Sequence, residues 1–417
     1  MHVRSKRLDR YVLEHSLRVA GWLRYAASAT PHCPVRPGHR VRLPHEVESI
    51  LAIQLFALGD LTLTVPALDA LRREWPDANL TLLVLPQLAP LARRFEAVDE
   101  VVALRSIRDL AGLRALRQRS PDLAVVFNPS LLGAWLAFLC GARTKLGYVG
   151  DAEGWRDQTL GRAGATLLDL PVEPVLDPCH EVARNLALTA TVASSPESPS
   201  LELKLTTADL ASVRQLLPSL GISDRRPLLG VHPTAKWVSR RWAPGRTAAA
   251  ADYAASCLDA HVIFFGAPGD GEMVERVRGL MHTPSVSAVG STDLPQLAAL
   301  VAACDLLLCH DSGPMHIAAG FGVPMVALFG PGNVTKFRPF HAQHRVAWQP
   351  VPCNPCRIQF MGQCPNNLCM KRLTVAMVEA CVDDVIDRWV VTEPVPRRDR
   401  LEPYLLDGSQ GVLSHGR

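Results

Sequence analysis

The sequence predicts an α/β protein of two doubly wound domains, each built on a parallel sheet, from three observations. From Ser49 onward, short Leu-rich or β-branched runs alternate with amphipathic segments, which is typical of βαβ units. The polar segment 193–200, which contains two prolines, interrupts this alternation and predicts a linker. A second alternating series follows. The 417 residues, 48% of them hydrophobic, are enough for two or three domains with large cores.

The first domain is expected over residues 49–195. Its predicted strands are 49–55, 80–85, 101–104, 123–127 and 145–148. The amphipathic segment 61–75 predicts a helix between the first two strands, so one right-handed crossover is expected there.

The second domain is expected over residues 201–390, with 1–48 and 393–417 as flanking segments. Its predicted strands are 228–232, 261–265, 306–309 and 326–329, and its predicted helices lie near 246–258, 270–281 and 293–303. Two such domains facing each other would leave a cleft, and ligands of these sheets bind beyond the carboxyl ends of the strands.

Composition excludes several classes of protein. The 44 basic and 40 acidic residues give a net charge of +4, and the basic excess lies in residues 1–48, so a nucleic-acid-binding protein is not indicated. Eleven cysteines are too few for a secreted disulfide scaffold, and no signal-peptide pattern is present, so a cytoplasmic protein is expected. The uncharged stretches 123–142 and 312–335 contain helix-breaking residues, so each predicts a strand and a helix, not a membrane span.

The loop FALGD follows the first predicted strand and ends at Asp60. Its glycine frees the backbone, and a carboxylate at this edge of the sheet could face the cleft as a general base. The alternative is that Asp60 caps the following helix, because Asp is a common capping residue.

The segment HDSGPMH, residues 310–316, ends a predicted strand and opens a helix. Ser312 and Gly313 precede Pro314, a residue suited to the first helical turn. This arrangement aims backbone N–H groups and the positive helix end at an anion, for which a phosphate or diphosphate is the natural ligand. A turn without a ligand is the alternative.

Two other loops also follow predicted strands. HPTAKWVSRRW, residues 232–242, supplies Lys236, Arg240 and Arg241 near two tryptophans and suits a phosphate clamp, with a solvated basic loop as the alternative. In GAPGDGE, residues 266–272, Asp270 or Glu272 could accept hydrogen bonds from ribose hydroxyls, although the pattern favours a helix cap.

Four cysteines fall within 17 residues, at Cys353, Cys356, Cys364 and Cys369. Four thiolates on a short loop suit a tetrahedral ion, zinc or iron, in a structural site. The alternative is a loop with free thiols or one labile disulfide.

Residues 8–26 predict a basic amphipathic helix near the N-terminus. Its apolar face carries Tyr11 and Trp22, and the other face carries the basic residues of this region, Lys6, Arg7, Arg10, Arg18 and Arg24. Such a helix can lie on an anionic membrane surface, here the inner membrane, or can pack on a protein surface.

Together these motifs resemble glycosyltransferase family 9, the bacterial heptosyltransferases of lipopolysaccharide synthesis. ALGDLTLTVPALDALRREWPDA is similar to the first strand, loop and helix of the family, HDSGPMHIAAGFGVPMVALFGP to its donor-binding signature, and the CxPC…CP…CM stretch to a downstream segment. The resemblance covers roughly residues 49–390.

The resemblance implies a GT-B fold of two Rossmann-like domains and an inverting transfer of heptose from ADP-heptose to a lipopolysaccharide core hydroxyl, without a catalytic metal. Asp60 would be the base that activates this hydroxyl. The residues that would bind the nucleotide-sugar donor are Lys236, Arg240, Glu272, Asp311, Ser312, Gly313 and His316.

The chain departs from the family pattern at several positions. Many members carry a basic residue and a small hydroxyl residue where this chain has Gln54 and Phe56, so its acceptor contacts are expected to differ. The family's phosphate-binding lysine usually lies two residues before a tryptophan, and Arg240 takes that place. Whether Arg240 or Lys236 holds the diphosphate stays open.

Two alternative functions follow. The cysteine cluster is similar to the iron-binding finger of autotransporter heptosyltransferases, which implies a protein serine as the acceptor. A catalytically inactive nucleotide-sugar-binding or scaffold protein is the alternative of another class, and the presence of both Asp60 and the full HDSGPMH segment argues against it.

Overall fold

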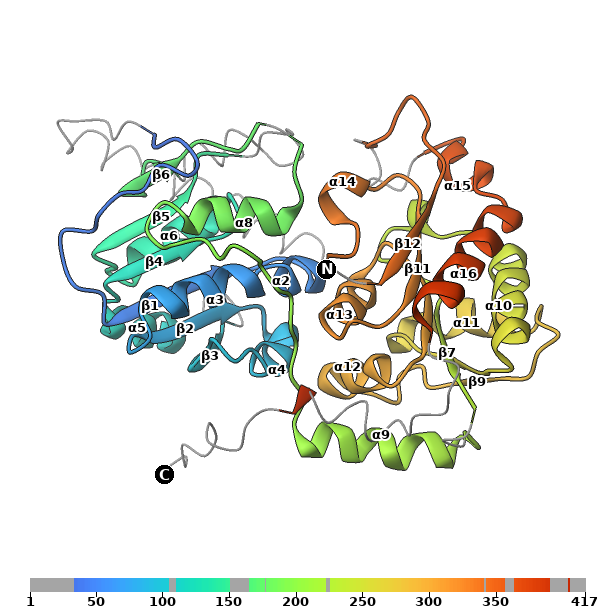
Figure 1. Ribbon diagram of the computed structural model, residues 1–417. Helices are drawn as coiled ribbons and strands as arrows, with labels where there is room; N and C mark the ends of the chain where they lie inside the picture. Colours follow the sequence, from blue (N-terminus) through green and yellow to red (C-terminus); the bar gives the residue numbers. More distant parts are fainter. Residues whose placement is uncertain are drawn as a thin grey trace, which may run out of the picture. The chain divides into compact units, whose positions relative to one another are not determined.

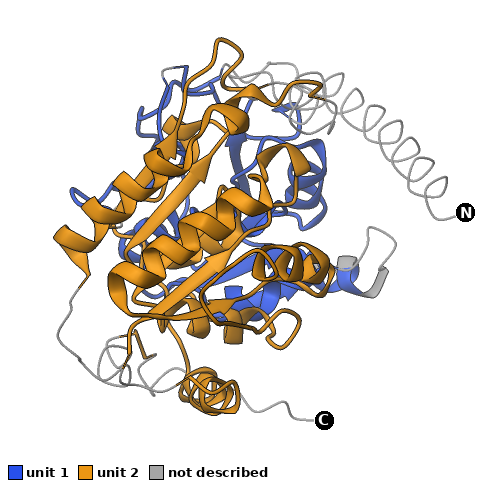
Figure 2. Cartoon of the chain, turned by 90° about the vertical axis from the view of Figure 1, so that its right-hand side faces the viewer, with its two compact units in different colours: residues 1–93, 97–199 blue, residues 94–96, 200–417 orange. Residues whose placement is uncertain are grey.

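The computed structural model divides into two compact units, residues 1–93 with 97–199 and residues 94–96 with 200–417 (Figure 2). It describes residues 34–104, 110–150, 165–176, 178–222, 226–340, 343–356, 364–390 and 404–405. Each unit contains a six-stranded parallel sheet with helices packed against it (Figure 1). The predicted α/β class with two doubly wound sheets is therefore confirmed.

Unit 1 has the sheet order β3-β2-β1-β4-β5-β6. Its strands are β1 (Ser49–Gln54), β2 (Asn79–Val84), β3 (Glu100–Ala103), β4 (Leu123–Val126), β5 (Thr144–Tyr148) and β6 (Leu170–Val172). Its helices are α2 (Leu58–Thr62), α3 (Val65–Glu74), η1 (Pro86–Leu88), α4 (Ala89–Ala92), α5 (Leu110–Arg119), α6 (Leu131–Leu139) and α8 (Glu181–Thr189). Helix α6 packs on β1, β4 and β5 beside α5, whereas α3 packs against α8.

Unit 2 has the sheet order β12-β11-β10-β7-β8-β9. Its strands are β7 (Leu228–His232), β8 (His261–Phe264), β9 (Ser285–Ser287), β10 (Leu306–His310), β11 (Met325–Phe329) and β12 (His344–Trp348). Its helices are α9 (Thr207–Ser219), η2 (Val238–Arg240), α10 (Pro244–Leu258), η3 (Pro268–Asp270), α11 (Gly271–Arg278), α12 (Leu294–Ala302), α13 (Gly313–Gly320), α14 (Val334–Phe337), α15 (Leu368–Arg372) and α16 (Val375–Trp389).

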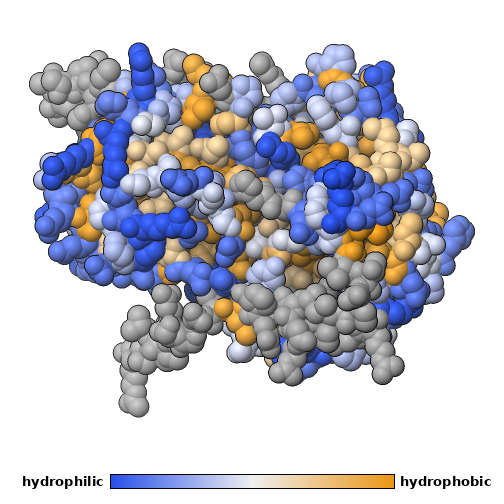
Figure 3. All heavy atoms as spheres, in the orientation of Figure 1, coloured by the Kyte–Doolittle hydropathy of each residue, from blue (hydrophilic) through white to orange (hydrophobic). Residues whose placement is uncertain are grey.

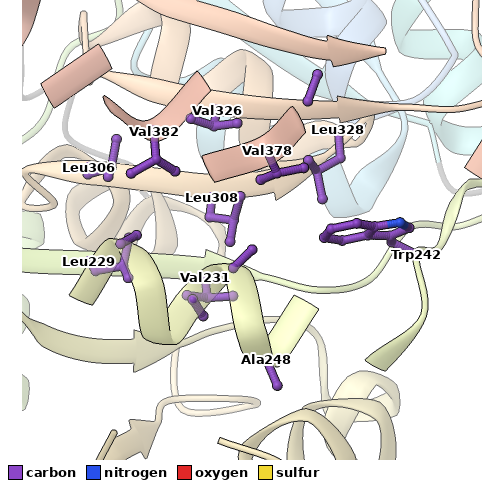
Figure 4. Packing of buried hydrophobic residues seen from close by; sticks show 14 of the residues in the cluster. Leu229, Val231, Trp242, Ala248, Leu306, Leu308, Val326, Leu328, Val378 and Val382 are labelled. Carbon is purple, nitrogen blue, oxygen red and sulfur yellow. The ribbon is translucent and has the colours of Figure 1, made fainter. Parts of the chain in front are cut away.

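The main core of unit 2 lies between the central strands and helices α10 and α16 (Figure 4). Successive side chains of a strand point to opposite faces, so alternate residues of β7, β10 and β11 share the face toward these helices. The strand and helix residues of this core labelled in Figure 4 are Leu229, Val231, Leu306, Leu308, Val326, Leu328, Ala248, Val378 and Val382. Because both faces of the sheet are covered, the central strands are almost continuously apolar.

The prediction of a single helix over 61–75 was wrong, because two helices, α2 and α3, occupy this stretch. Pro66 lies in the first turn of α3 and has no N–H to continue the hydrogen bonds of α2. The break leaves Asp60 in a short helix of its own directly after β1.

Three strands that the pattern did not predict, β6, β9 and β12, lie at the edges of the sheets. They are short or carry polar residues, because an edge strand has one fewer neighbour to bury it. The two uncharged stretches form β4 with α6 and α13 with β11, as predicted. Among the described residues, no helix is long and apolar enough to cross a membrane.

The predicted membrane-binding helix, 8–26, lies outside the described residues, as does the tail from 391 onward except for 404–405. On the face shown in Figure 3, hydrophilic and hydrophobic side chains are interspersed. The large hydrophobic side chains that are exposed in the described part of the chain are Phe138, Leu176, Val238, Leu280 and Leu368. They come from separate elements, and such scattered exposure is ordinary for a protein surface.

Candidate functional site

The carboxyl ends of β7 and β10 form the centre of the candidate site in unit 2. The chain runs from β7 to β8 and β9 on one side, whereas β10, β11 and β12 lie on the other side. Connections that diverge in this way leave a crevice beyond the two strands. The predicted segments 232–242 and 310–316 leave the sheet at this point.

Helix α13 begins beside β7. Ser312 is its N-terminal flanking residue, but the Ser312 side chain makes no capping bond to the helix. The hydroxyl instead donates to the backbone oxygen of His310 at 3.0 Å and lies 3.2 Å from Nδ1 of His232. Gly313 and Pro314 form the first turn, as the sequence predicted. Backbone N–H groups at a helix start of this kind attract anions.

Two buried histidines fix the loops around this helix start. The backbone N–H of Trp242 donates to Nε2 of His310 at 2.9 Å, so the proton of this ring is on Nδ1, which lies 3.2 Å from the backbone oxygen of His232. Since the Ser312 hydroxyl proton is already used, Nδ1 of His232 donates to the Ser312 oxygen. Its Nε2 then accepts from the Thr234 hydroxyl at 3.2 Å.

Both imidazoles are neutral in this arrangement. Burial lowers the pKa of His232 to about 4, although the charge of Asp270 opposes this shift. Burial also lowers the pKa of His310 to about 4. Neutral rings can each use one nitrogen as donor and the other as acceptor, which this hydrogen-bond chain requires.

Arg240 and Asp311 form an ion pair beside the start of α13. Nη1 of Arg240 lies 2.9 Å from Oδ2 of Asp311, and the Asp311 side chain is only 4% exposed. Burial raises the pKa of the Asp311 carboxyl, and the Arg240 guanidinium opposes this shift. The aspartate therefore anchors an arginine next to the anion-attracting helix end.

The structure places the other predicted donor residues on the same unit. His316 is buried on α13, and Lys236 is exposed, with Nζ 5.4 Å from the centre of the Trp237 ring. Glu272 is exposed in the first turn of α11. Asp270 accepts from the backbone N–H of Ala267 at 2.9 Å, which confirms the capping interpretation for this residue.

Asp60 lies in unit 1, in the first turn of α2, with its side chain half-buried. Ala57, not Asp60, is the flanking residue of that helix. The backbone oxygen of Asp60 accepts from Thr64 Oγ1 at 2.7 Å and from Gln54 Nε2 at 3.3 Å. Gln54 thus supports the loop that presents Asp60, a role that its residue type did not reveal.

The four clustered cysteines lie in unit 2 on either side of segment 357–363, which is outside the described residues. All four are thiols, not disulfides. Burial raises the pKa of Cys369 to about 11, and the other three thiols contribute to this shift. No group of three or more His, Cys, Asp or Glu within the described ranges could hold a metal ion. The metal therefore stays a prediction.

The cysteine segment packs on the loop that follows β11. The backbone N–H of Cys356 donates to the oxygen of Pro331 at 3.0 Å, and Asn354 Nδ2 donates to the oxygen of Gly330 at 2.9 Å. The next residues of this loop approach Asp311, because a Cβ at Gly332 would lie 2.1 Å from Oδ2 of Asp311. The cysteine segment thus supports the loop behind the Arg240–Asp311 pair.

The model of glycosyltransferase family 9, the heptosyltransferases, matches residues 110–364, more than half of the chain. The chain belongs to glycosyltransferase family 9. It is therefore a glycosyltransferase. The matched range includes every predicted donor residue but ends before Cys369 and begins after Asp60.

Relatives and solved structures agree with this assignment. Lipopolysaccharide heptosyltransferase 3 of Escherichia coli K12 is 24% identical over 294 residues, 68% of this chain and 82% of the relative. A family 9 glycosyltransferase structure from Veillonella parvula covers 81% of this chain and 97% of its own, with a TM-score of 0.69 and 22% identity. The E. coli ADP-heptose lipopolysaccharide heptosyltransferase II structure covers 82% and 99%, with a TM-score of 0.64 and 22% identity.

A weaker likeness is to TibC, an iron-containing dodecameric heptosyltransferase of enterotoxigenic E. coli. It covers 82% of this chain and 77% of its own, with a TM-score of 0.51 at 12% identity, and shows the shared fold alone. With the two Rossmann-like units, these structures support the GT-B fold that the resemblance implied.

Sequence reasoning missed several residues that shape the candidate site of this family 9 enzyme. His232, Thr234 and His310 act through the hydrogen-bond chain, and Gly332 makes room for Asp311. The available signal was a histidine as the last residue of two otherwise apolar strands. Such a residue is buried at the edge where ligands bind and must find partners there.

We expect Gly332→Ala to destabilise the protein, because its Cβ would lie 2.1 Å from a buried carboxylate oxygen. Overpacking of this kind typically costs about 1 to 3 kcal/mol of folding free energy. Chemical denaturation measures the effect. Gly269→Ala is the control, since a Cβ there meets nothing within 4 Å. Equal stability of the two variants would show that Asp311 is not tightly held.

Protonation of the two buried histidines should destabilise the protein in acid. Their folded pKa of about 4 lies below the ordinary value of 6.5, so their contribution is complete above pH 6.5 and is lost as the pH falls toward 4. One pKa unit corresponds to about 1.4 kcal/mol. His310→Gln keeps an acceptor for Trp242 and should flatten the dependence of unfolding free energy on pH between 6.5 and 4.5. A slope identical to that of the unaltered protein would contradict the assignment.

Proposed function

We propose that the enzyme transfers heptose from ADP-heptose to a hydroxyl of the lipopolysaccharide core, with inversion and without a catalytic metal. The main support is the open start of α13 beside Arg240 at the centre of the unit 2 sheet. A relative named a lipopolysaccharide heptosyltransferase and a structure named for ADP-heptose favour this donor and acceptor over other sugars.

In this proposal the diphosphate binds at the first turn of α13. The N–H groups of that turn and the guanidinium of Arg240 face the negative oxygens, and the exposed Lys236 can fold over them. These groups stabilise the charge that develops on ADP as its bond to heptose breaks. Asp311 keeps Arg240 in place, and His316 and Glu272 contribute further contacts to the donor.

Asp60 acts as the general base in the same proposal. Inversion requires the acceptor oxygen to attack the anomeric carbon from the side opposite the leaving diphosphate. The carboxylate takes the hydroxyl proton as the new carbon–oxygen bond forms and the bond to ADP breaks. The Asp60 loop suits this role because Gln54 and Thr64 fix its backbone.

A transfer assay with radiolabelled ADP-heptose tests the function. We expect label in heptose-deficient core lipopolysaccharide. Such an acceptor is anchored in a bilayer, so we propose that the enzyme works at the cytoplasmic face of the inner membrane. Label in an autotransporter serine instead would identify the protein-modifying alternative, which the cysteine spacing favours. Binding of ADP-heptose without any transfer would identify an inactive binding protein.

Asp60→Asn should lower turnover roughly 100-fold or more, which is the usual contribution of a general base. The amide keeps the shape of the side chain but cannot take the proton. Melting temperature and affinity for ADP should stay close to those of the unaltered enzyme. Asp77→Asn, at an exposed turn of the same unit, is the matched control and should keep full turnover. Full activity of Asp60→Asn would place the base elsewhere.

We also propose that Cys353, Cys356, Cys364 and Cys369 hold one structural zinc or iron ion. The spacing of the four residues supports this, because four thiolates on a short loop suit a tetrahedral ion. Metal analysis of anaerobically purified enzyme should find about one ion per chain. Cys353→Ser with Cys356→Ser should lose it, whereas Cys257→Ser, an exposed control, should not. Protein without metal would refute the proposal.

A further inference from the structure

Asn128 in unit 1 has a buried amide without a hydrogen-bond partner. Its side chain is 2% exposed, and among the described residues neither Oδ1 nor Nδ2 has a partner. Buried amides nearly always have hydrogen-bond partners, because an amide that loses its hydrogen bonds to water and gains none in the protein costs free energy. This amide therefore calls for an explanation from outside the described chain.

The position of Asn128 points to a ligand. Asn128 follows β4, and β4 lies next to β1 at the centre of the unit 1 sheet. The pairing of these strands continues to their carboxyl ends, where the backbone N–H of Phe127 donates to the oxygen of Ile53 at 3.2 Å. The order β3-β2-β1-β4-β5-β6 makes this pair the place where the connections diverge, as β7 and β10 are in unit 2.

A second polar atom at this edge is also unsatisfied. Gln54, the last residue of β1, uses Nε2 to hold Thr64 and the Asp60 backbone, while its Oε1 has no partner in the described structure. The carboxyl ends of neighbouring strands thus carry two uncharged amides with unused hydrogen-bonding atoms. Asp60 follows the same strand.

We propose that Asn128 binds the sugar acceptor through its side-chain amide, next to the hydroxyl that Asp60 activates. The proposal rests on the proposed function, because a transfer between two sugars needs a second site besides the donor site in unit 2. An amide offers a donor and an acceptor side by side, and sugar hydroxyls need both. It has no charge with which to hold a phosphate. The ligand class is therefore a polyhydroxylated sugar ring.

The backbone around Asn128 keeps the amide in a fixed position. Pro129 follows directly, and Ser130 begins α6 by accepting from the backbone N–H of Gly133 at 3.0 Å. Helix α6 in turn packs on β1, β4 and β5. A side chain on such a rigid support loses little further freedom when a ligand binds.

Asn128→Leu tests the proposal, because it removes the amide but keeps a similar volume. If the amide serves only a ligand, the free protein should melt at the same temperature or higher, since an unsatisfied polar group has been removed. ADP affinity should not change, whereas KM for heptose-deficient core oligosaccharide should rise about tenfold or more. Asn128→Asp, which exchanges the donor for a charged acceptor, should weaken acceptor binding in the same direction.

Asn185→Leu is the matched control in the same unit. Asn185 is 1% exposed, and its Nδ2 donates to the backbone oxygen of Leu63 at 3.0 Å. This variant should lower the melting temperature and leave KM for the acceptor unchanged. A lower melting temperature of Asn128→Leu with an unchanged KM would overturn the proposal, since the amide would then have a structural role.

Failure of the proposed function can be told apart from failure of this assignment. If the unaltered enzyme transfers no heptose, the proposed function is wrong. Calorimetric binding of the same core oligosaccharide then decides about Asn128. Weaker binding by Asn128→Leu would support the assignment, whereas equal binding, or no binding by either protein, would overturn it.

Discussion

Both sheets have their first strand in the interior, and this topology decides where polar side chains can be used. In each sheet the strands that follow the first one lie on one side of it, and the later strands lie on the other side, beginning with β4 or β10. Such an order leaves a crevice beyond the carboxyl ends of the two central strands. Asn128, His232 and Asp311 are buried at or directly after these strand ends, and the half-buried Asp60 lies in the short helix that follows β1.

The proposed donor site uses buried groups that are neutral or paired, and this follows from the cost of burying charge. His232 and His310 stay uncharged, so that each can link one loop to another. Asp311 is ionised only at the cost of desolvation and therefore depends on Arg240. An arginine already held by a carboxylate would enter the proposed diphosphate site with little loss of freedom.

Much of this architecture could be predicted from the sequence, because central parallel strands are apolar on both faces and are bounded by turn residues. The strand 228–232 was predicted with the bounds of β7, and the helix start at Gly313 followed from the proline next to it. The edge strands β6, β9 and β12 depend on tertiary neighbours and were missed. The break before α3 was also missed, although Pro66 marks it in the sequence. The same holds for the histidine chain, since periodicity shows that a residue is buried but not which atoms it meets.

The two sheet centres differ in how their polar groups are satisfied, and the difference suits the proposed ligands. In unit 2, hydrogen bonds join His232, His310 and Ser312, and an ion pair holds Arg240, so the site is already rigid before a charged donor binds. Rigid charges favour a diphosphate because they need not reorganise around it. In unit 1, Gln54 and Asn128 keep unused amide atoms. A sugar without charge has no strong electrostatic attraction to the protein, so its binding energy must come from hydrogen bonds. The free protein leaves such bonds unmade at Gln54 and Asn128, which costs folding stability. In return, the site selects ligands whose hydroxyl groups can make these bonds.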